Sequence, residues 1–269
     1  MKYCRLLINN EPQFALVETE GSTGRELITR VFKSNPGARI PDEDAVSKRI
    51  SPIPLQDAAL LTPVLPSKIV CVGRNYRAHA AELGNEVPTE PLVFYKPPSS
   101  LNDPGAEIRL PKLSQDVHYE GELAAVIGKA CYHVRQDEDV RDYIFGYTIL
   151  NDVTARDLQK KENQWARAKG FDTFTPVGPV VVYGLDPWAG IEVETRINSE
   201  VRQHGTTADF IFPLDVIIRH ITAAMTLVPG DVIATGTPEG VGPLHAGDIV
   251  EITVQGVGTL RNPVVNDAD

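Results

Sequence analysis

The chain has 269 residues, of which 42% are apolar, and it carries 36 acidic against 26 basic side chains, a formal net charge of −10 at pH 7. This is the composition of a globular protein with a sizeable core, and the lack of a Lys/Arg-rich run argues against a nucleic-acid-binding surface. The three cysteines are widely spaced and form no Cys-x-x-Cys pair, which argues against a disulfide framework or a structural zinc site and favours a reducing cytoplasm.

The chain shows no export or membrane signal. Its first ten residues turn polar too early for a signal peptide, and no run approaches the roughly 18 apolar residues of a membrane-spanning helix. We therefore expect a soluble, cytoplasmic protein with no membrane partner.

The N-terminal segment is expected to form a small α+β domain over residues 1–65. Tyr3–Ile8 and Gln13–Glu18 have the pattern of two strands around a turn-forming Asn-Asn-Glu cluster. Periodicity is weak from Gly21 to Ser51, and a proline-punctuated passage then ends near residue 66, where we place a boundary. No internal repeat follows, so residues 66–269 are expected to form one larger domain.

The larger domain opens with a strand and a helix that carry a candidate proton-transfer pair. Lys68–Val72 reads as a strand, and Asn75–Leu83 reads as a helix stopped by a glycine. His79 and Glu82 lie three residues apart, so they share a helix face on which the carboxylate can orient the imidazole and raise its basicity. A surface histidine beside a surface glutamate is the alternative. Two strands are expected to follow, at Leu92–Lys96 and Glu107–Leu110.

The apolar run Val117–Gly128 predicts a buried strand that carries two carboxylates near its start. Glu120 and Glu122 would project from the same face, with their Cα atoms roughly 6.5–7 Å apart. Their charges repel, and a carboxylate pair that enters a core must be neutralised by a proton, a base or a metal. A solvated face with a neighbouring Lys or Arg is the alternative, but Leu123–Ile127 has the pattern of a strand buried on both faces.

A second apolar strand, Ile144–Asp152, ends in another acid. A short helix is expected before it, around Glu138–Tyr143, and Thr154–Asp157 resembles a capping box at the start of the next helix. This leaves Asp152 at the mouth of the strand. Taken alone, Asp152 could be only a turn or cap residue, but two buried strands that both deliver carboxylates favour one cation shared by all three acids.

The donor atoms predict the kind of ion. Glu120, Glu122 and Asp152 offer only hard oxygen atoms, so Mg²⁺ or Mn²⁺ is expected, with Ca²⁺ as an occupant. Three carboxylates leave coordination positions open for a small-molecule substrate that chelates through two oxygens, such as a 2-oxo acid. A lysine ammonium in the place of the ion, or an acid remote from the other two, would contradict this interpretation.

The rest of the chain adds a lysine, a core helix and a glycine-rich loop. Lys169 lies among small and aromatic residues, where a partly desolvated ammonium can approach a substrate, although surface lysines are commoner. Pro213–Met225 has the apolar spacing of a helix that faces the core. The glycines of Gly236–Gly242 allow backbone N–H groups to converge on an anion, or form only a turn. Strands are expected at Pro179–Tyr183, Ile191–Asn198, Val201–His204, Asp231–Thr235, Asp248–Val254 and Thr259–Pro263, which makes the fold class mostly β with peripheral helices.

Five sequence blocks stand in one order along the larger domain: Gly73-Arg74-Asn75-Tyr76-x-x-His79, Lys96-Pro97, His118-Tyr119-Glu120-Gly121-Glu122-Leu123, Asn151-Asp152-Val153-Thr154-Ala155-Arg156-Asp157 and Thr235-Gly236-Thr237-Pro238-Glu239-Gly240-Val241-Gly242. Their order and spacing resemble the fumarylacetoacetate hydrolase family, and most closely its short acylpyruvate hydrolase and oxaloacetate decarboxylase branch. The resemblance implies a mostly β (α+β) fold, in which a catalytic domain over residues 66–269 with a rolled sheet follows a small N-terminal domain. It also implies a homodimer.

By position in these blocks, the resemblance implies roles for individual residues. Glu120, Glu122 and Asp152 match the family's metal ligands, His79 with Glu82 its water-activating pair, and Lys169 its catalytic lysine. Gln159 matches a residue near the substrate carbonyl and Thr237 one that holds the substrate carboxylate, and Arg74, Asn75 and Gly236 are further expected substrate-binding residues. The longer fumarylacetoacetases carry another acid where this chain has Val72, so three protein ligands are expected.

The reaction that the resemblance implies is hydrolysis of a 2,4-dioxo acid of the acylpyruvate or fumarylpyruvate type. In this hypothesis His79 takes a proton from water, which attacks the C4 carbonyl, and C3–C4 cleavage expels a pyruvate enolate that the metal stabilises. Oxaloacetate decarboxylation and 2-hydroxymuconate-type isomerisation or decarboxylation pass through related anions and are alternatives. A non-enzymatic protein with a structural cation is a further alternative, but it predicts no histidine, lysine or anion-binding loop beside the acids.

Overall fold

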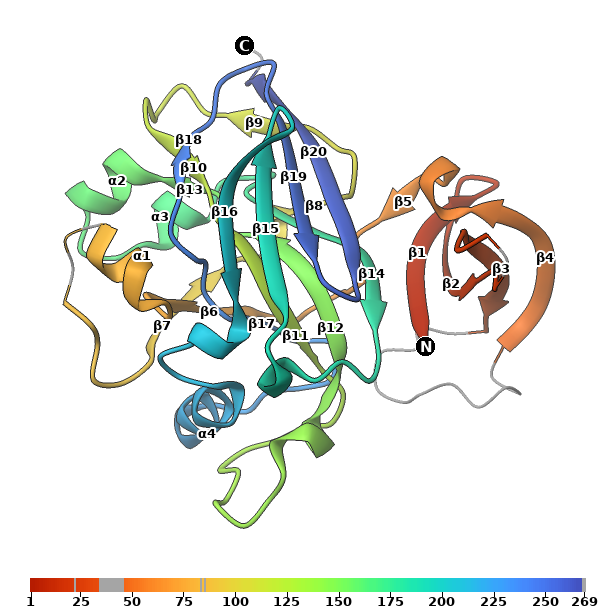
Figure 1. The fold of residues 1–269 in the computed structure, drawn as a ribbon, viewed down its shortest axis with the longest axis horizontal. Coiled ribbons are helices and arrows are strands. Elements are labelled where there is room, and N and C mark those ends of the chain that lie inside the picture. The colour runs from red at the N-terminus through yellow and green to blue at the C-terminus, as the bar shows by residue number, and fades with distance from the viewer. Residues whose placement is uncertain (22, 34–45, 83, 85, 268–269) are drawn as a thin grey trace.

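The computed structural model describes residues 1–21, 23–33, 46–82, 84 and 86–267. Over these residues the fold is mostly β, with three sheets and four short α-helices. Figure 1 shows the strands rolled into the body of the molecule, the helices at its periphery and the first strands as a separate lobe. The predicted fold class is thus confirmed. None of the described helices is long and apolar enough to cross a membrane.

The elements run in the following order. The strands are β1 (Lys2–Ile8), β2 (Glu11–Thr19), β3 (Glu26–Phe32), β4 (Val46–Pro54), β5 (Leu60–Leu61), β6 (Ile69–Gly73), β7 (Leu92–Lys96), β8 (Leu101–Asn102), β9 (Ile108–Leu110), β10 (Val117–Tyr119), β11 (Gly121–Ile127), β12 (Ile144–Asn151), β13 (Thr154–Ala155), β14 (Thr175–Val182), β15 (Glu192–Ile197), β16 (Glu200–Thr206), β17 (Val232–Ala234), β18 (Gly242–Pro243), β19 (Ile249–Val254) and β20 (Gly258–Asn266). The α-helices are α1 (Arg77–Glu82), α2 (Arg156–Lys161), α3 (Ala166–Lys169) and α4 (Leu214–Ala224).

The largest sheet has twelve strands, and its main path is β4-β3-β2-β1-β14-β12-β11-β17-β6-β7. Strand β11 lies near its middle, and all seven of its residues are buried. A five-stranded sheet, β16-β15-β19-β20-β9, packs against one face of this region, and the apolar side chains of the two sheets form one core cluster there. A second apolar cluster covers the other face of β11. Burial on both faces explains why the sequence of β11 is continuously apolar rather than alternating.

The N-terminal strands continue the large sheet rather than forming one of their own. The predicted first hairpin is present as β1 and β2, and β1 also pairs with β14, where Tyr3 lies opposite Val181. The weakly periodic segment after it forms β3 and β4 on its described residues, while residues 34–45 lie outside them. The division at residue 66 therefore falls within a continuous hydrogen-bonded sheet and stays a prediction.

Two local expectations are wrong. The run predicted as one strand is broken at Glu120, because β10 pairs with β13 and β18 in a three-stranded sheet whereas β11 joins the large sheet. The predicted capping box is absent, since Thr154 belongs to β13 and its Oγ1 donates to the carbonyl of Asp152 at 2.8 Å. Helix α2 begins instead at Arg156, without a side-chain cap.

The other predicted elements are mostly present. The core helix is α4, and the two C-terminal hairpins are β15–β16 and β19–β20. The helix expected around Glu138–Tyr143 is a single 3₁₀ turn, Val140–Tyr143. Helix α1 begins at Arg77, and the predicted end of this helix at Leu83 lies outside the described residues.

Candidate active site

Three buried carboxylates meet where β10, β11 and β12 end or begin. Glu120 occupies the break between β10 and β11, Glu122 is the second residue of β11, and Asp152 directly follows β12. Because β11 and β12 are paired neighbours, with Gly121 opposite Asn151, the three acids emerge side by side. Their ligand oxygens all lie within 4.8 Å of one another, and the residues are 5%, 2% and 1% exposed. The acids thus converge as expected.

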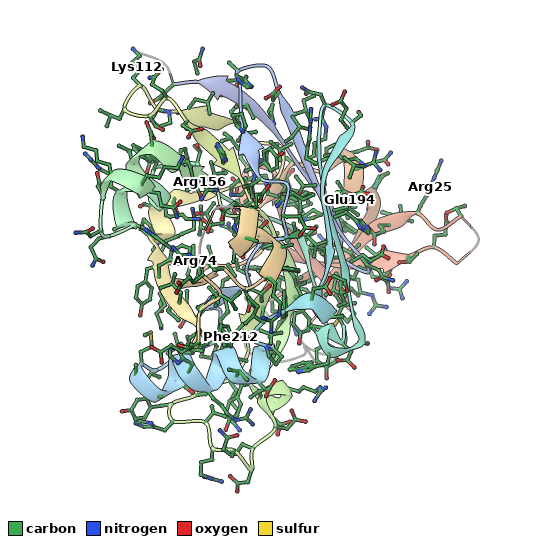
Figure 2. The ribbon with its side chains drawn as sticks, turned by 60° about the vertical axis from the view of Figure 1, so that its left-hand side comes forward. Arg25, Arg74, Lys112, Arg156, Glu194 and Phe212 are labelled. Atoms are coloured by element: carbon green, nitrogen blue, oxygen red, sulfur yellow. The ribbon has the colours of Figure 1, made fainter. Side chains whose placement is uncertain are left out.

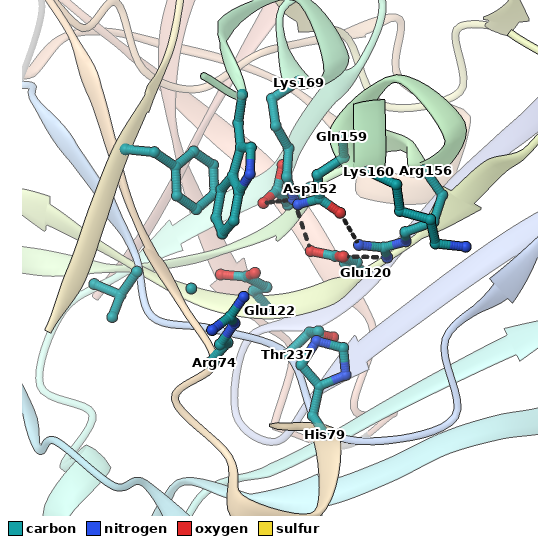
Figure 3. Close-up of a pocket in the computed structure, with 14 residues that line it drawn as sticks. Arg74, His79, Glu120, Glu122, Asp152, Arg156, Gln159, Lys160, Lys169 and Thr237 are labelled. Carbon is teal, nitrogen blue, oxygen red and sulfur yellow. Dashed lines mark hydrogen bonds and ion pairs between the residues drawn. The ribbon is translucent and has the colours of Figure 1, made fainter. Parts of the chain in front are cut away.

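Three buried cationic side chains face these acids, and Figure 3 shows two of them, Lys169 and Arg156. Lys169 Nζ lies 2.9 Å from Glu120 Oε2 and 2.6 Å from Asp152 Oδ2. Lys96 Nζ lies 2.7 Å from Asp152 Oδ1, and the Arg156 guanidinium contacts Glu120 Oε1. The Lys96 contact is close but poorly aligned, because Asp152 Oδ1 accepts no hydrogen bond from the described residues.

The pKa values follow this arrangement. Burial alone would raise the pKa of Glu120, but Lys169 and Arg156 outweigh burial and hold it well below its ordinary range. Burial would likewise lower the pKa of Lys169, yet Asp152 and Glu120 raise it. For Lys96 burial dominates and lowers the pKa despite Asp152. Lys169 is therefore held as an ammonium by the carboxylates that it contacts.

Glu122 is the exception among the acids. Within the part of the chain that the structure describes, it forms no ion pair, and its carboxylate accepts one backbone hydrogen bond, from Gly236 at 2.7 Å. Burial, together with Asp152 and Glu120, raises the pKa of Glu122 well above its ordinary value. A buried carboxylate in this position is stabilised only by a proton or by a cation.

The contacts of the three acids indicate how well a divalent ion fits among them. A lysine ammonium in the place of the ion would argue against a metal site, and Lys169 partly meets this condition because its ammonium contacts two of the three acids. It leaves Glu122 without a positive partner and Asp152 Oδ1 without an aligned donor. Oxygen-only donors that remain under-compensated suit Mg²⁺ or Mn²⁺. The cluster could therefore hold a metal ion, although the Lys169 ammonium contacts two of its three acids.

A histidine–glutamate pair lies at the same cavity. His79, on α1, is 4% exposed and lines the cavity, and its Nδ1 lies 3.3 Å from Glu82 Oε2. The other oxygen of Glu82 accepts the N–H of Gly240 at 3.0 Å, so the carboxylate is fixed on both sides. With Nδ1 turned to Glu82, the ring can present Nε2 to the cavity.

The acids and the histidine form the wall of one cavity of about 230 Å³. Gln159 and Thr237 also line it, together with the aromatic side chains of Phe94 and Trp165, whose ring centroids lie 5.1 Å apart. Arg74 lines it as well, and Figure 3 shows its guanidinium pointing toward Glu122. Figure 2 places Arg74 and Arg156 in the same region of the molecule.

Several expected substrate-binding residues already have protein partners. Thr237 Oγ1 donates to the carbonyl of Gly121 at 2.9 Å, and Gln159 Oε1 accepts from Arg156 at 2.6 Å. Asn75 is fully buried, does not line the cavity, and bonds the backbone of Phe212 and Thr235. Gly236 contributes its N–H to Glu122. The contacts of these residues with a substrate stay predictions.

Sequence reasoning assigned no role to Lys96 or Arg156, although both stand in the blocks quoted above. Lys96 is 1% exposed and Arg156 is 3% exposed, and each reaches a candidate ligand from an element distant in sequence. A lysine at the end of an apolar strand is the one signal that could have indicated a buried partner for Lys96, since a buried ammonium requires an acid.

Comparison with known proteins adds independent observations. The family model described as fumarylacetoacetate (FAA) hydrolase C-terminal matches residues 68–265. The chain is 52% identical over 214 residues to protein Rv2993c of Mycobacterium tuberculosis, covering 79% of this chain and 80% of that one. It is 43% identical over 224 residues to the oxaloacetate tautomerase YisK of Bacillus subtilis, covering 78% and 74%. A solved structure titled 5-carboxymethyl-2-hydroxymuconate delta-isomerase from Mycobacterium smegmatis superposes with a TM-score of 0.87 at 42% identity, covering 99% and 100%.

Proposed function

Because the chain belongs to the fumarylacetoacetate hydrolase family, we propose that it is a divalent-metal-dependent enzyme that forms the enolate of a small 2-oxo acid. The observation that carries this proposal is the cluster of Glu120, Glu122 and Asp152 in the wall of a cavity. Glu122 lacks a cationic partner among the described residues, and Lys169 and His79 line the same cavity. A cation bound there would polarise the carbonyl oxygen of a chelating substrate and stabilise negative charge that develops on it.

The cavity supports a small, doubly charged substrate. Ligand pockets commonly measure about 300–1,000 Å³, so a cavity of about 230 Å³ suits a short acid rather than a large molecule. Arg74 has no hydrogen bond or ion pair with any described residue, and its backbone is held in the left-handed region at φ 56°. An unpaired guanidinium that points into a cavity is a suitable partner for a second carboxylate. We therefore propose a 2-oxo dicarboxylic acid.

The side chains that line the cavity have different chemical roles. Lys169, charged and 2% exposed, lies where it can donate to the substrate oxygen on which negative charge develops. His79, oriented by Glu82, can take a proton from the carbon next to the carbonyl or from a water molecule. Phe94 and Trp165 cover one side of the cavity and limit access of water, which strengthens each electrostatic contact.

The proton that His79 removes decides between two reactions. Removal from C3 of oxaloacetate interconverts its keto and enol forms, and the similarity to a Bacillus subtilis oxaloacetate tautomerase favours this reaction. Removal from water followed by attack on C4 cleaves an acylpyruvate, and the contact of the buried His79 with Glu82 favours this second candidate. Decarboxylation of oxaloacetate needs neither the water nor the base.

The proposal is tested with oxaloacetate and acetylpyruvate in the presence of Mg²⁺ or Mn²⁺ and then of excess EDTA. Enol formation is followed by ultraviolet absorbance, and cleavage by pyruvate release. We expect turnover of at least one substrate that EDTA abolishes and added metal restores. Turnover indifferent to EDTA, or no turnover of either substrate, would contradict the proposed function.

The variant His79→Ala separates the two reactions. If the histidine activates water, cleavage of acetylpyruvate falls by about 10²–10⁴-fold, the usual contribution of a general base. Enolisation of oxaloacetate retained in the same variant would show that enolisation uses another base. His220, on the remote helix α4, gives a matched control.

The role of Arg74 is tested by comparing a dicarboxylate with a monocarboxylate. In Arg74→Met we expect weaker binding of oxaloacetate with binding of acetylpyruvate unchanged, and Arg74→Lys should restore part of the difference. Quenching of tryptophan fluorescence reports binding without turnover, since Trp165, one of the two tryptophans, lines the cavity. An equal loss for both substrates would show that Arg74 does not bind the second carboxylate.

A further inference from the structure

Gln203 is a buried polar residue that no motif indicated. It lies on β16, in the five-stranded sheet, which carries none of the candidate site residues named above. It is 0% exposed, although glutamine is usually a surface residue. A side-chain amide is buried at this depth only where its hydrogen-bonding groups are satisfied.

The amide of Gln203 joins two segments of the site. Its Oε1 accepts the N–H of Gly121 at 3.0 Å, and its Nε2 donates to Thr237 Oγ1 at 2.8 Å and to the carbonyl of Pro238 at 2.8 Å. These contacts fix the orientation of the amide, because a flipped amide would face the Gly121 N–H with another donor and the Pro238 carbonyl with another acceptor.

The first segment is the one that carries two candidate metal ligands. Gly121 stands between Glu120 and Glu122, its N–H is held by Gln203, and its carbonyl accepts from Thr237 Oγ1 at 2.9 Å. Both backbone polar groups of the residue between the ligands are thus bonded to the Gln203–Thr237 pair. The directions in which the two carboxylates leave the backbone depend on this link.

The second segment is the loop from Gly236 to Gly240. At its start the N–H of Gly236 donates to Glu122 at 2.7 Å, and at its end the N–H of Gly240 donates to Glu82 at 3.0 Å. Glu82 in turn contacts His79. One short loop therefore contacts a candidate ligand and the histidine–glutamate pair, and Gln203 bonds its middle to Gly121.

The β15–β16 hairpin packs closely against both segments at three glycines. A Cβ added at Gly121 would lie 2.2 Å from Thr195 Oγ1, and one added at Gly205 would lie 2.7 Å from Pro238 Cβ. At Gly240 an added Cβ would lie 1.9 Å from the carbonyl oxygen of Arg202. The β15–β16 hairpin thus touches the loop and the ligand segment directly, and closely packed groups transmit small displacements.

We propose that Gln203 is a positioning residue that fixes the metal-ligand segment relative to the loop that holds Glu82 and His79. This inference rests on the proposed function, since it concerns the alignment of the same metal site and proton-transfer pair. Gln203 contacts neither an ion nor a substrate. Residues that orient metal ligands in this way typically contribute about 10–100-fold to metal affinity or activity.

The test is Gln203→Met, which keeps the length of the side chain and removes its hydrogen bonds. We expect Mn²⁺ affinity, measured by electron paramagnetic resonance without substrate, to fall about 10–100-fold, and kcat at saturating Mn²⁺ to fall with it. Thr222→Val is the matched control, because Thr222 is a fully buried hydrogen-bonding residue on the remote helix α4. The control should lower thermal stability and leave Mn²⁺ affinity unchanged.

The outcomes separate the inference from the function on which it rests. A Gln203→Met protein that loses stability as the control does, but binds Mn²⁺ and turns over as the wild type does, would overturn the inference. A wild type that binds no Mn²⁺ would overturn the proposed function instead. If Gln203→Met does not fold, Thr237→Val breaks the same link from its other side, and Thr237→Ser should retain the affinity that Thr237→Val loses.

Discussion

The surroundings of single side chains divide the charged cluster into two kinds of residue. Glu120 and Asp152 each form ion pairs: Lys169 contacts both acids, Arg156 contacts Glu120, and Lys96 lies close to Asp152 Oδ1 without an aligned hydrogen bond. Glu122 is equally buried and has no such partner among the residues described. The site is therefore least stable at Glu122, and this residue gains most from a bound cation.

Replacement of Glu122 by glutamine should remove this destabilisation. Because the pKa of Glu122 is raised in the folded state, the metal-free wild type binds more protons folded than unfolded, and its stability falls as pH rises from the ordinary glutamate pKa toward the raised value. Metal-free Glu122→Gln should have a Tm at or above that of the wild type and a flatter dependence on pH. Thermal melts in EDTA across pH 4–9 measure this, and a Tm lowered at every pH would refute it.

Lys169 should matter for turnover more than for folding. Its two partners keep Arg156 and Lys96 when the ammonium is removed, so Lys169→Met should remain folded. Loss of one contact to developing negative charge typically costs about 10²–10³-fold in kcat. Lys68→Met is the control, because Lys68 pairs with the fully buried Asp231 far from the cavity and affects stability alone. Normal turnover by Lys169→Met would exclude a catalytic role.

At the scale of elements, long apolar runs were predictable and the breaks within them were not. The apolar pattern of β11 and the periodicity of α4 are local, so the sequence predicts both. The break at Glu120 arises because β10 and β11 pair with different sheets, a consequence of contacts distant in sequence. The three acids and His79 were likewise predictable from their sequence blocks. The contacts of Gln203 were not, because they join a hairpin to Gly121, about 80 residues away in sequence.

The acidic segment also has a glycine, Gly121, where a larger residue would not fit. A Cβ at Gly121 would approach Thr195 Oγ1 to 2.2 Å, so Gly121→Ala overpacks the contact between β11 and β15. Overpacking of this kind costs about 1–3 kcal/mol, and we expect a lower Tm together with weaker Mn²⁺ binding. Adding Thr195→Ala should restore part of both, since Thr195 Oγ1 has no hydrogen-bond partner among the described residues. A double variant no better than Gly121→Ala would show that another contact is responsible.

At the scale of the molecule, the N-terminal strands share one sheet with the rest of the chain, while all the candidate site residues follow residue 66. Tyr3 of β1 packs edge-on against Phe145 of β12, with ring centroids 5.6 Å apart, so the two parts also share a core. The described N-terminal strands therefore support the fold that carries the site, and none of the candidate site residues lies on them. The homodimer implied by the family resemblance stays a prediction, which sedimentation equilibrium would test.

Deletion of residues 1–65 should show whether the N-terminal strands contribute to stability, to metal binding or to both. The truncated chain leaves β14 without β1, which exposes an unpaired strand edge and part of an apolar core. We expect a lower Tm and concentration-dependent aggregation, but Mn²⁺ binding by the soluble fraction. A truncated protein with wild-type stability would instead show that the boundary near residue 66 separates two independent domains.

The proposed chemistry depends most on one divalent ion bound by Glu120, Glu122 and Asp152. Titration of the purified, EDTA-treated protein with Mn²⁺, followed by electron paramagnetic resonance, tests this binding directly. We expect one bound Mn²⁺ per chain, displaced by Mg²⁺ and lost in both Glu122→Gln and Asp152→Asn. A folded wild type that binds no Mn²⁺, or variants that bind it as the wild type does, would contradict it.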